Sequence, residues 1–382
     1  MKRSFLAIIL FSLVFSAFGQ KSRVMAVTQM IDAEKYEEAK EAIELALVND
    51  KTSKWPRTYF TKGLLCQTAY EAGVKSKDSK KTNLYPDQLF LAYRSYEKAL
   101  ELDLRGRLHN VIGQKYYLLA NDFRITGEEL YSKGKYESAL TAFEHALLIG
   151  DSELISAKAD TSLVYNAAMA AFESKEWGKA INYLTRLHEN AYSPSASLLL
   201  AISYEMEGDT LRSEEVMVQG LELYQYEDSI VMYLVNQMVG SGRLESAIEV
   251  LDRAIEARPD NYRYYWARGL VYRRMNNNEE AIKSFILADE RSPESPALYY
   301  HIGICYYNMG IELRESALRI LENNEYAAIR RQYLDKFREA LKWIEKSYEL
   351  DPDNQETAST LYQLYDQLQM RKEQESLRRL MN

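Results

Sequence analysis

The residues of this chain that could do chemistry are few, and they do not form a known catalytic or metal-binding arrangement. The candidates are His109, His145, His188, His301, Cys66 and Cys305. No histidine has a second histidine or a cysteine at the spacing that a zinc site uses. The sequence also lacks the G-x-S-x-G motif and a glycine-rich phosphate loop. We therefore predict no catalytic residue, no bound metal and no cofactor, and a protein that is not an enzyme.

Two of these residue types have structural interpretations. His301 directly precedes Ile302, a position expected to pack between helices, so we interpret it as a structural or groove residue rather than a general base. Cys66 and Cys305 both lie inside apolar helical patterns. Cysteine is among the residues most often buried, so we expect two buried free thiols rather than a disulfide.

The elements that must position these residues follow from a repeat of 34 residues. "AIEVLDRAIEARPDN" starts at 247 and "AIKSFILADERSPES" starts at 281, and each has Ala, a bulky apolar residue, Ala and Pro at the same spacing. The central small residues of four successive copies lie at 180, 213, 247 and 281. Upstream of Ala281, the residues Tyr265, Gly269 and Tyr272 complete the pattern. Small residues let two helix backbones approach closely and proline ends a helix, so the pattern predicts antiparallel helix pairs.

This pattern resembles the tetratricopeptide repeat, whose signature is W-x2-L-G-x2-Y, then A-x3-F, then P. The resemblance covers residues 20–355 in about eight copies. It implies an all-α fold, a right-handed α-solenoid of about eight helix pairs plus a C-terminal capping helix pair. The long connections also resemble those of exported repeat proteins of Gram-negative bacteria, a family with no general assigned activity.

Residues 1–19 have the order of a secretory signal peptide. Lys2 and Arg3 give a positive start, residues 5–15 form an apolar run, and Ala17 and Gly19 are small residues where a signal peptidase cleaves. A membrane anchor is the alternative, but a span needs about 20 apolar residues. No cysteine lies near the cleavage point, which disfavours a lipoprotein anchor. We expect export, with the periplasm favoured over the cell surface, and no membrane span after cleavage.

Longer intervals between repeats suggest the domain organisation. We predict N-terminal repeats over 20–104, with a Lys-rich insertion near 75–86, and further repeats over 105–355. Residues 311–340 contain neither Gly nor Pro, which predicts a long helical hairpin there, with its turn near 322–325. This hairpin is either a tolerated surface elaboration or a docking arm. Capping helices are expected over 356–382.

A stripe of residues on the first helix of each pair is the candidate binding site. In the repeats that this chain resembles, that helix lines the concave side, and its non-packing face is open. Here this face is apolar and aromatic with few charges, and we name it the concave stripe. Its members are Tyr165, Met169, Phe172, Leu198, Ile202, Met232, Asn236, Trp266, Leu270, Arg273, Tyr300, Ile304 and Tyr307. These residues either pack against neighbouring repeats or form a groove for a partner segment.

The function that these observations predict is recognition. We expect a non-enzymatic protein–protein interaction scaffold or adaptor that binds segments of a protein or peptide partner through the concave surface. Binding of glycans or other solutes in the outer envelope is the alternative, since Trp and Tyr rings stack on sugars. The formal charge of −8 disfavours nonspecific binding to nucleic acid. Self-association is left open.

Overall fold

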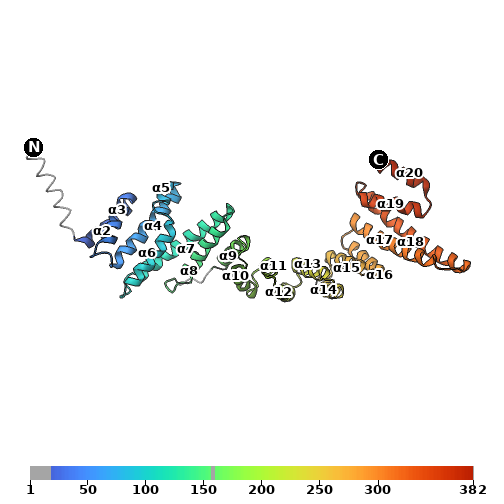
Figure 1. The fold of residues 1–382 in the computed structure, drawn as a ribbon, viewed down its shortest axis with the longest axis horizontal. Helices are drawn as coiled ribbons and strands as arrows, with labels where there is room; N and C mark the ends of the chain where they lie inside the picture. Colours follow the sequence, from blue (N-terminus) through green and yellow to red (C-terminus); the bar gives the residue numbers. More distant parts are fainter. Residues whose placement is uncertain (1–18, 156–159, 382) are drawn as a thin grey trace, which may run out of the picture. The chain divides into compact units, whose positions relative to one another are not determined.

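The computed structural model of the chain describes residues 19–155 and 160–381. The expected signal peptide falls on residues that lie outside this range, apart from Gly19. Every regular element of the described residues is a helix, and short connections fold each helix back along the one before it (Figure 1). Two compact units make up the chain, divided between Asn190 and Ala191, and each is described by itself below.

Unit 1 ends at Asn190 and contains four helix pairs among its described residues. Its helices are α2 (Gln20–Asp32), α3 (Tyr36–Val48), α4 (Pro56–Ser76), α5 (Ser79–Thr82), α6 (Gln88–Leu102), α7 (His109–Ser132), α8 (Tyr136–Gly150), α9 (Thr161–Glu173) and α10 (Trp177–Glu189). The short helix α5 lies in the Lys-rich segment, where the Lys81 ammonium is 2.6 Å from the Glu34 carboxylate.

Unit 2 begins at Ala191 and contains five helix pairs, the last of them the expected capping pair. Its helices are α11 (Pro194–Met206), α12 (Thr210–Leu223), α13 (Asp228–Gly240), α14 (Leu244–Ala257), α15 (Tyr262–Arg274), α16 (Asn278–Asp289), α17 (Pro296–Ala317), α18 (Asn323–Leu350), α19 (Gln355–Gln367) and α20 (Arg371–Met381). In the described residues, eight pairs therefore precede the pair α19–α20, which confirms the all-α solenoid architecture expected from the repeats.

The packing of each pair follows from its small and bulky residues. Ala281 and Phe285 of α16 are fully buried, and Phe285 packs directly on Gly269 of α15. A Cβ atom at Gly269 would lie 2.5 Å from the Phe285 ring, and one at Gly127 would lie 2.5 Å from the Phe143 ring. No side chain fits at such a distance, so glycine is what allows the two helices to approach this closely.

A repeated turn closes most of the pairs. In seven of them, the second residue after the first helix has a positive φ. These residues are Glu34, Gly134, Lys175, Gly208, Gly242, Asn276 and Gln369. The following backbone N–H reaches back to a carbonyl in the last turn of the helix, as Glu176 N does to Ala171 O at 2.9 Å. This is the Schellman arrangement, which satisfies the end of a helix at a left-handed residue.

The predicted long hairpin corresponds to α17 and α18. The connection between them is 318–322, just before the turn expected at 322–325. Phe337 of α18 is fully buried, and a Cβ at Gly310 of α17 would lie 2.6 Å from its ring. The two helices thus pack along their length by the same small-against-bulky contact that joins the shorter pairs.

A polar cluster joins α4 to α7 in unit 1. Gln67 Nε2 donates to Glu71 Oε1 at 2.9 Å and to Asp122 Oδ2 at 3.4 Å, and Tyr96 Oη donates to Gln67 Oε1 at 2.9 Å. Burial, together with the charge of Glu71, raises the pKa of the Asp122 carboxyl. In this cluster a single amide group, that of Gln67, donates to the carboxyl groups of both Glu71 and Asp122.

The cysteines are placed as predicted. Cys66 and Cys305 are both buried, and neither forms a disulfide. Burial raises the pKa of each thiol to about 12, so both stay protonated at neutral pH. None of the described helices is both long enough and apolar enough to cross a membrane.

Helices contact mainly their neighbours in chain order. In unit 2 the main contacts join each helix to the next one, and α11 also reaches α13. Stacking within unit 2 therefore buries apolar residues between neighbouring helices, as in the clusters around Phe285 and around Phe337.

Candidate partner-binding surface

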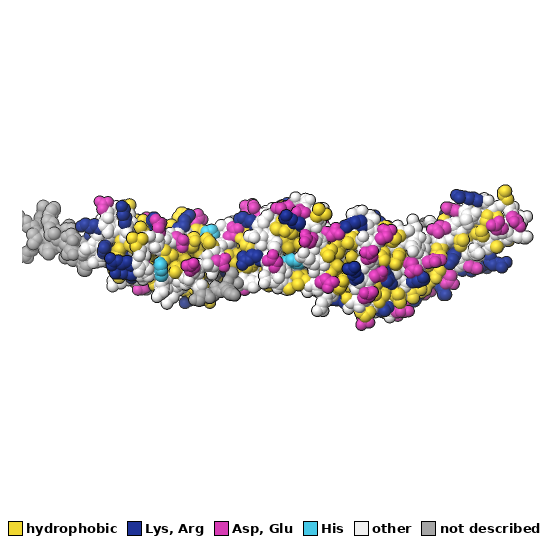
Figure 2. Space-filling model, turned by 90° about the horizontal axis from the view of Figure 1, so that it is seen from below, with side chains coloured by type: hydrophobic (Ala, Val, Ile, Leu, Met, Phe, Trp, Pro, Cys, Tyr) yellow, Lys and Arg dark blue, Asp and Glu magenta, His cyan; other side chains and the backbone are white. Residues whose placement is uncertain are grey.

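The concave stripe lies at the surface of the first helices. None of its thirteen residues is fully buried, while Asn236 and Leu270 are exposed and the others are half-buried. On the face drawn in Figure 2, hydrophobic side chains likewise reach the surface among charged ones. The stripe is therefore accessible in part, and the shape of the surface decides which of its residues could hold a partner.

In unit 1, the stripe residues Tyr165 and Met169 line a pocket between α7, α8 and α9. This α7–α9 pocket has a volume of about 300 Å³ and is lined by Glu128, Tyr131, Phe143, Tyr165, Asn166 and Met169. Three aromatic rings thus contribute to its wall. Phe172, one turn further along α9, does not line this pocket. Its ring packs edge-on against Trp177 of α10, with the ring centroids 5.4 Å apart, so it helps to join its own helix pair.

In unit 2, four stripe residues come together in a groove between α13 and α15. This α13–α15 groove has a volume of about 510 Å³. Its lining is Met232, Val235, Asn236, Val239, Ala267, Leu270, Val271, Arg273 and Arg274. Most of these side chains are aliphatic, and the two arginines follow each other at the C-terminal end of α15.

Arg273 is held in place by His301 of α17. Arg273 Nη1 lies 2.9 Å from His301 Nδ1. The His301 ring stacks on Phe285, with centroids 5.5 Å apart and planes 22° from parallel. Burial and the adjacent Arg273 lower the pKa of His301 to about 4. At neutral pH the ring is therefore neutral, and Nδ1 accepts the hydrogen bond from the guanidinium group. This agrees with our interpretation of His301 as a structural residue.

The two arginines of the groove keep their positive charge unneutralised. Among the described residues, no carboxylate lies within salt-bridge distance of Arg273 or Arg274. Since one N–H of Arg273 is used by His301, the other donors of its guanidinium group remain for a ligand. The groove thus combines an aliphatic floor with a fixed source of positive charge.

The other stripe residues line neither of these two spaces. Trp266 lies against His301 and Tyr262, with ring centroids 6.4 Å away in each case. Tyr300 and Tyr307 pack on the buried cluster around Phe337 and Ile344. Leu198, Ile202 and Ile304 are half-buried on α11 and α17.

Some residues of the α13–α15 groove were not part of the sequence prediction. Val235, Val239 and Val271 are aliphatic, and the repeat pattern assigns such residues to packing. Arg274 lies beside the projected face, and the consecutive Arg273–Arg274 pair was the one signal that could have included it. Among the described residues, no group of three or more His, Cys, Asp or Glu side chains could hold a metal ion.

Stacked pairs of antiparallel helices with an open groove on the first helices define an all-α helical-repeat protein. Residues 239–296, which span α14, α15 and α16, match the family model described as tetratricopeptide repeat. The match identifies this part of the chain as tetratricopeptide repeat, and the other described helix pairs share its antiparallel architecture.

Comparison with individual proteins gives distant similarities. The chain is 21% identical over 243 residues to the BBSome complex member BBS4 of Bos taurus, a match that covers 62% of this chain and 45% of that protein. The chain thus spans less than half the length of this curated relative.

Three solved structures illustrate the structural similarities. MamA from Desulfovibrio magneticus is 18% identical, with a TM-score of 0.36 over 51% of this chain and 97% of that one. MamA AMB-1 is 20% identical, with a TM-score of 0.35 over 50% and 92%. A TPR repeats protein from Bacteroides fragilis is 16% identical, with a TM-score of 0.35 over 66% and 98%.

Proposed function

We propose that this protein is a non-enzymatic scaffold that binds a short segment of a partner protein in the α13–α15 groove. The observation that carries the proposal is the aliphatic floor of the groove beside the unneutralised Arg273 and Arg274. A segment that offers one bulky apolar side chain and a carboxylate one or two residues away matches both features. Apolar burial supplies affinity, and the charge-assisted hydrogen bond from a guanidinium group fixes the register.

The composition of the groove favours a peptide over a sugar. Its lining contains no Trp, Tyr or Phe, and rings of that kind are what a saccharide stacks on. Glycan binding is supported at another place, the α7–α9 pocket, where Tyr131, Phe143 and Tyr165 contribute to the wall. A glycan array probed with the protein and with its Tyr165→Ala variant tests this second candidate, which requires a glycan signal that the substitution removes.

The peptide proposal is tested by selecting a random peptide library, displayed on phage, on the purified protein. We expect the selected sequences to combine an aliphatic or Met residue with Asp, Glu or a free C-terminus. Arg273→Ala should weaken their binding about tenfold, because a charge-assisted hydrogen bond is lost. Arg338 is an exposed arginine on α18 that pairs with Asp335 at 2.6 Å, so Arg338→Ala is the matched control and should bind normally. Equal affinity of the wild type and Arg273→Ala would contradict the proposal.

We further propose that the protein acts after export, in the periplasm or at the cell surface. The support is the signal-peptide pattern of residues 1–19. N-terminal sequencing of the protein recovered from the periplasmic fraction tests this, and a mature N-terminus near Gln20 is the expected result.

A further inference from the structure

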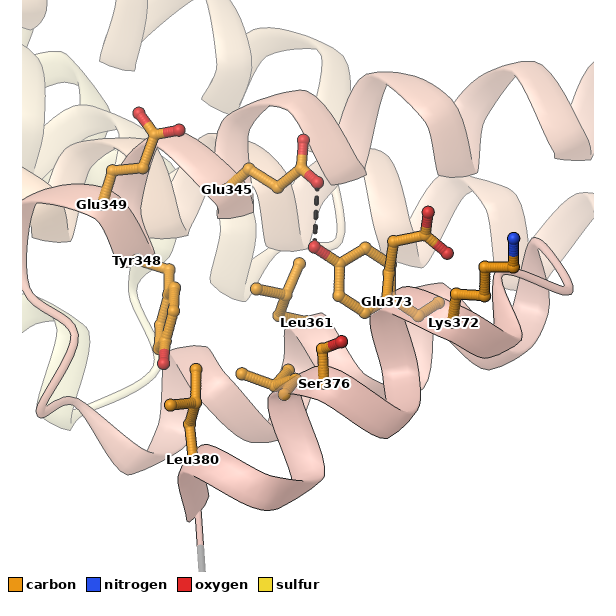
Figure 3. A pocket seen from close by; sticks show the side chains of 10 residues that line it. Glu345, Tyr348, Glu349, Leu361, Lys372, Glu373, Ser376 and Leu380 are labelled. Carbon is orange, nitrogen blue, oxygen red and sulfur yellow. Dashed lines mark hydrogen bonds between the residues drawn. The ribbon is translucent and has the colours of Figure 1, made fainter.

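A second groove, between α18, α19 and α20, has features that the concave stripe does not include. It has a volume of about 380 Å³ (Figure 3). Its lining is Glu345, Tyr348, Glu349, Leu361, Tyr365, Lys372, Glu373, Ser376, Leu377 and Leu380. We name it the α18–α20 groove. It lies within unit 2 and shares no residue with the α13–α15 groove.

Leucines from two helices form the floor of this groove. Leu361 and Leu377 are 2% and 4% exposed, whereas Leu380 is 75% exposed although it lies on the groove wall. Figure 3 shows Leu380 beside Tyr348, on the side of α20 that faces α18. An exposed leucine next to a buried pair gives an apolar surface that continues from the core into the groove.

Carboxylates dominate the rim. Glu345 and Glu349 come from α18 and Glu373 from α20, and Lys372 is the one basic residue in the lining. In the part of the chain that the structure describes, no Lys or Arg lies within salt-bridge distance of these three carboxylates. Figure 3 shows the carboxylates of Glu345, Glu349 and Glu373 in the upper part of the view, with Lys372 beside Glu373. The lining therefore combines three carboxylates and one ammonium group with the apolar floor, and its balance is negative.

One of the three carboxylates is fixed by the groove itself. Tyr365 Oη donates a hydrogen bond to Glu345 Oε1 at 3.0 Å, drawn as a dashed line in Figure 3. Burial and this carboxylate raise the pKa of Tyr365 far above its ordinary value, so the phenol keeps its proton and remains a donor. Glu345 is thus held at the rim as an acceptor with a second oxygen to offer.

We propose that the α18–α20 groove binds a basic amphipathic helix of a partner protein. Leucine-like side chains on one face of that helix would cover Leu361, Leu377 and Leu380. Lysine or arginine side chains beside them would meet Glu345, Glu349 and Glu373. The choice of occupant rests on charge complementarity, because three carboxylates against one lysine in the lining disfavour an acidic segment. This site has the opposite charge preference to the α13–α15 groove, so one protein can hold two different segments.

The probe for this proposal is a fluorescein-labelled model peptide with leucines at i, i+3, i+4 and i+7 and lysines elsewhere. Its affinity for the full protein is measured by fluorescence anisotropy, and the same peptide with glutamates in place of lysines is the charge control. We expect the Leu/Lys peptide to bind, to bind more weakly as salt is raised, and the Leu/Glu peptide not to bind. Equal binding of the two peptides would overturn the proposal.

Three single substitutions test the location. Glu349→Lys should weaken the Leu/Lys peptide about fivefold, because an attractive pair becomes a repulsive one. Glu375→Lys changes the net charge equally at an exposed position of α20 that does not line the groove, so it should have little effect. Leu380→Ser should weaken binding without any change in charge. Equal losses for Glu349→Lys and Glu375→Lys would show general charge attraction and refute the site.

Two further measurements separate this proposal from its alternatives. Arg273→Ala should leave the affinity for the Leu/Lys peptide unchanged, so failure of the α13–α15 groove and failure of this one can be told apart. Sedimentation velocity at several concentrations tests a second copy of the chain as the occupant. Self-association that Leu380→Ser abolishes would overturn the assignment to a different protein, whereas a wild-type monomer that binds the peptide supports it.

Discussion

Acidification should destabilise the helices around His301, and the pKa of this residue sets the size of the effect. Its ordinary pKa is 6.5, and burial and Arg273 lower it to about 4 in the folded protein. Between these values the unfolded chain binds a proton that the folded protein excludes. Stability is therefore complete above about pH 6.5 and falls as the pH decreases toward 4. From pH 7.5 to pH 5.0 this linkage amounts to about 2 kcal/mol.

The effect is measured locally, because long helix arrays do not unfold as one cooperative unit. Hydrogen exchange followed by mass spectrometry reports the opening free energy of peptides from α16 and α17. A loss of 2 kcal/mol corresponds to a decrease of about thirtyfold in their protection. His301→Gln retains a hydrogen-bond acceptor but does not titrate, so this part of the pH dependence should disappear. His109, an exposed histidine of α7, gives the control variant His109→Gln, which should behave as the wild type does.

Two results would refute this reasoning. The first is an identical pH dependence of α16 and α17 protection in the wild type and in His301→Gln. The second is an NMR titration of the His301 ring with a midpoint near 6.5, since a ring that protonates there is neither buried nor held by Arg273.

Three other predictions follow from the packing of the helix pairs. Lys175 has a φ of 62° in the turn between α9 and α10, so Lys175→Gly should stabilise the protein by about 1 kcal/mol in urea denaturation. Asp122, whose pKa is raised by burial and Glu71, destabilises the folded state as the pH rises. Asp122→Asn should therefore increase the melting temperature more at pH 8 than at pH 5. Phe285→Ala should lower the local stability measured by hydrogen exchange by about 3–5 kcal/mol, because it leaves a cavity where the ring packs on Gly269.

Each of these has a control or a contrary result. Lys179 lies within α10, and Lys179→Gly should destabilise by about 1 kcal/mol; a loss at both lysines would contradict the left-handed turn. A shift in melting temperature that is the same at both pH values would show that Asp122 is not protonated in the folded protein. Normal exchange of α15 and α16 in Phe285→Ala would show that this ring does not hold the pair together.

The helix pairs could be predicted from the sequence because their determinants are local. The pattern of Gly269, Ala281 and Phe285 recurs at a fixed spacing. In each such pair, a small residue facing a bulky one lets the two helices pack closely. For the long hairpin, the sequence signal was the absence of Gly and Pro over 311–340, which lets both helices extend. The buried state of Cys66 follows from the apolar pattern around it.

The grooves were only partly predictable because they depend on how successive pairs sit against one another. Met232 and Leu270 could be projected onto an open face, but Val235 and Val239 have the same character as core residues. The hydrogen bond between Arg273 and His301 joins residues 28 apart in sequence, and no local pattern encodes it. Leu380 resembles a packing residue in the sequence, and the arrangement of α18 and α20 leaves it exposed.

In unit 2, contacts join mainly helices that are adjacent in chain order. This limits how far the loss of one helix affects the others. A nick or a disruptive substitution in α20 removes contacts from α19 and leaves the stacking of α13, α14 and α15 in place. A mutation that destroys the α18–α20 groove should therefore leave the α13–α15 groove folded, and the reverse should also hold. Pulling on a segment bound at α20 would detach the helix pairs in order from that end, because α17 and α18 hold each other more extensively than they hold α16 or α19.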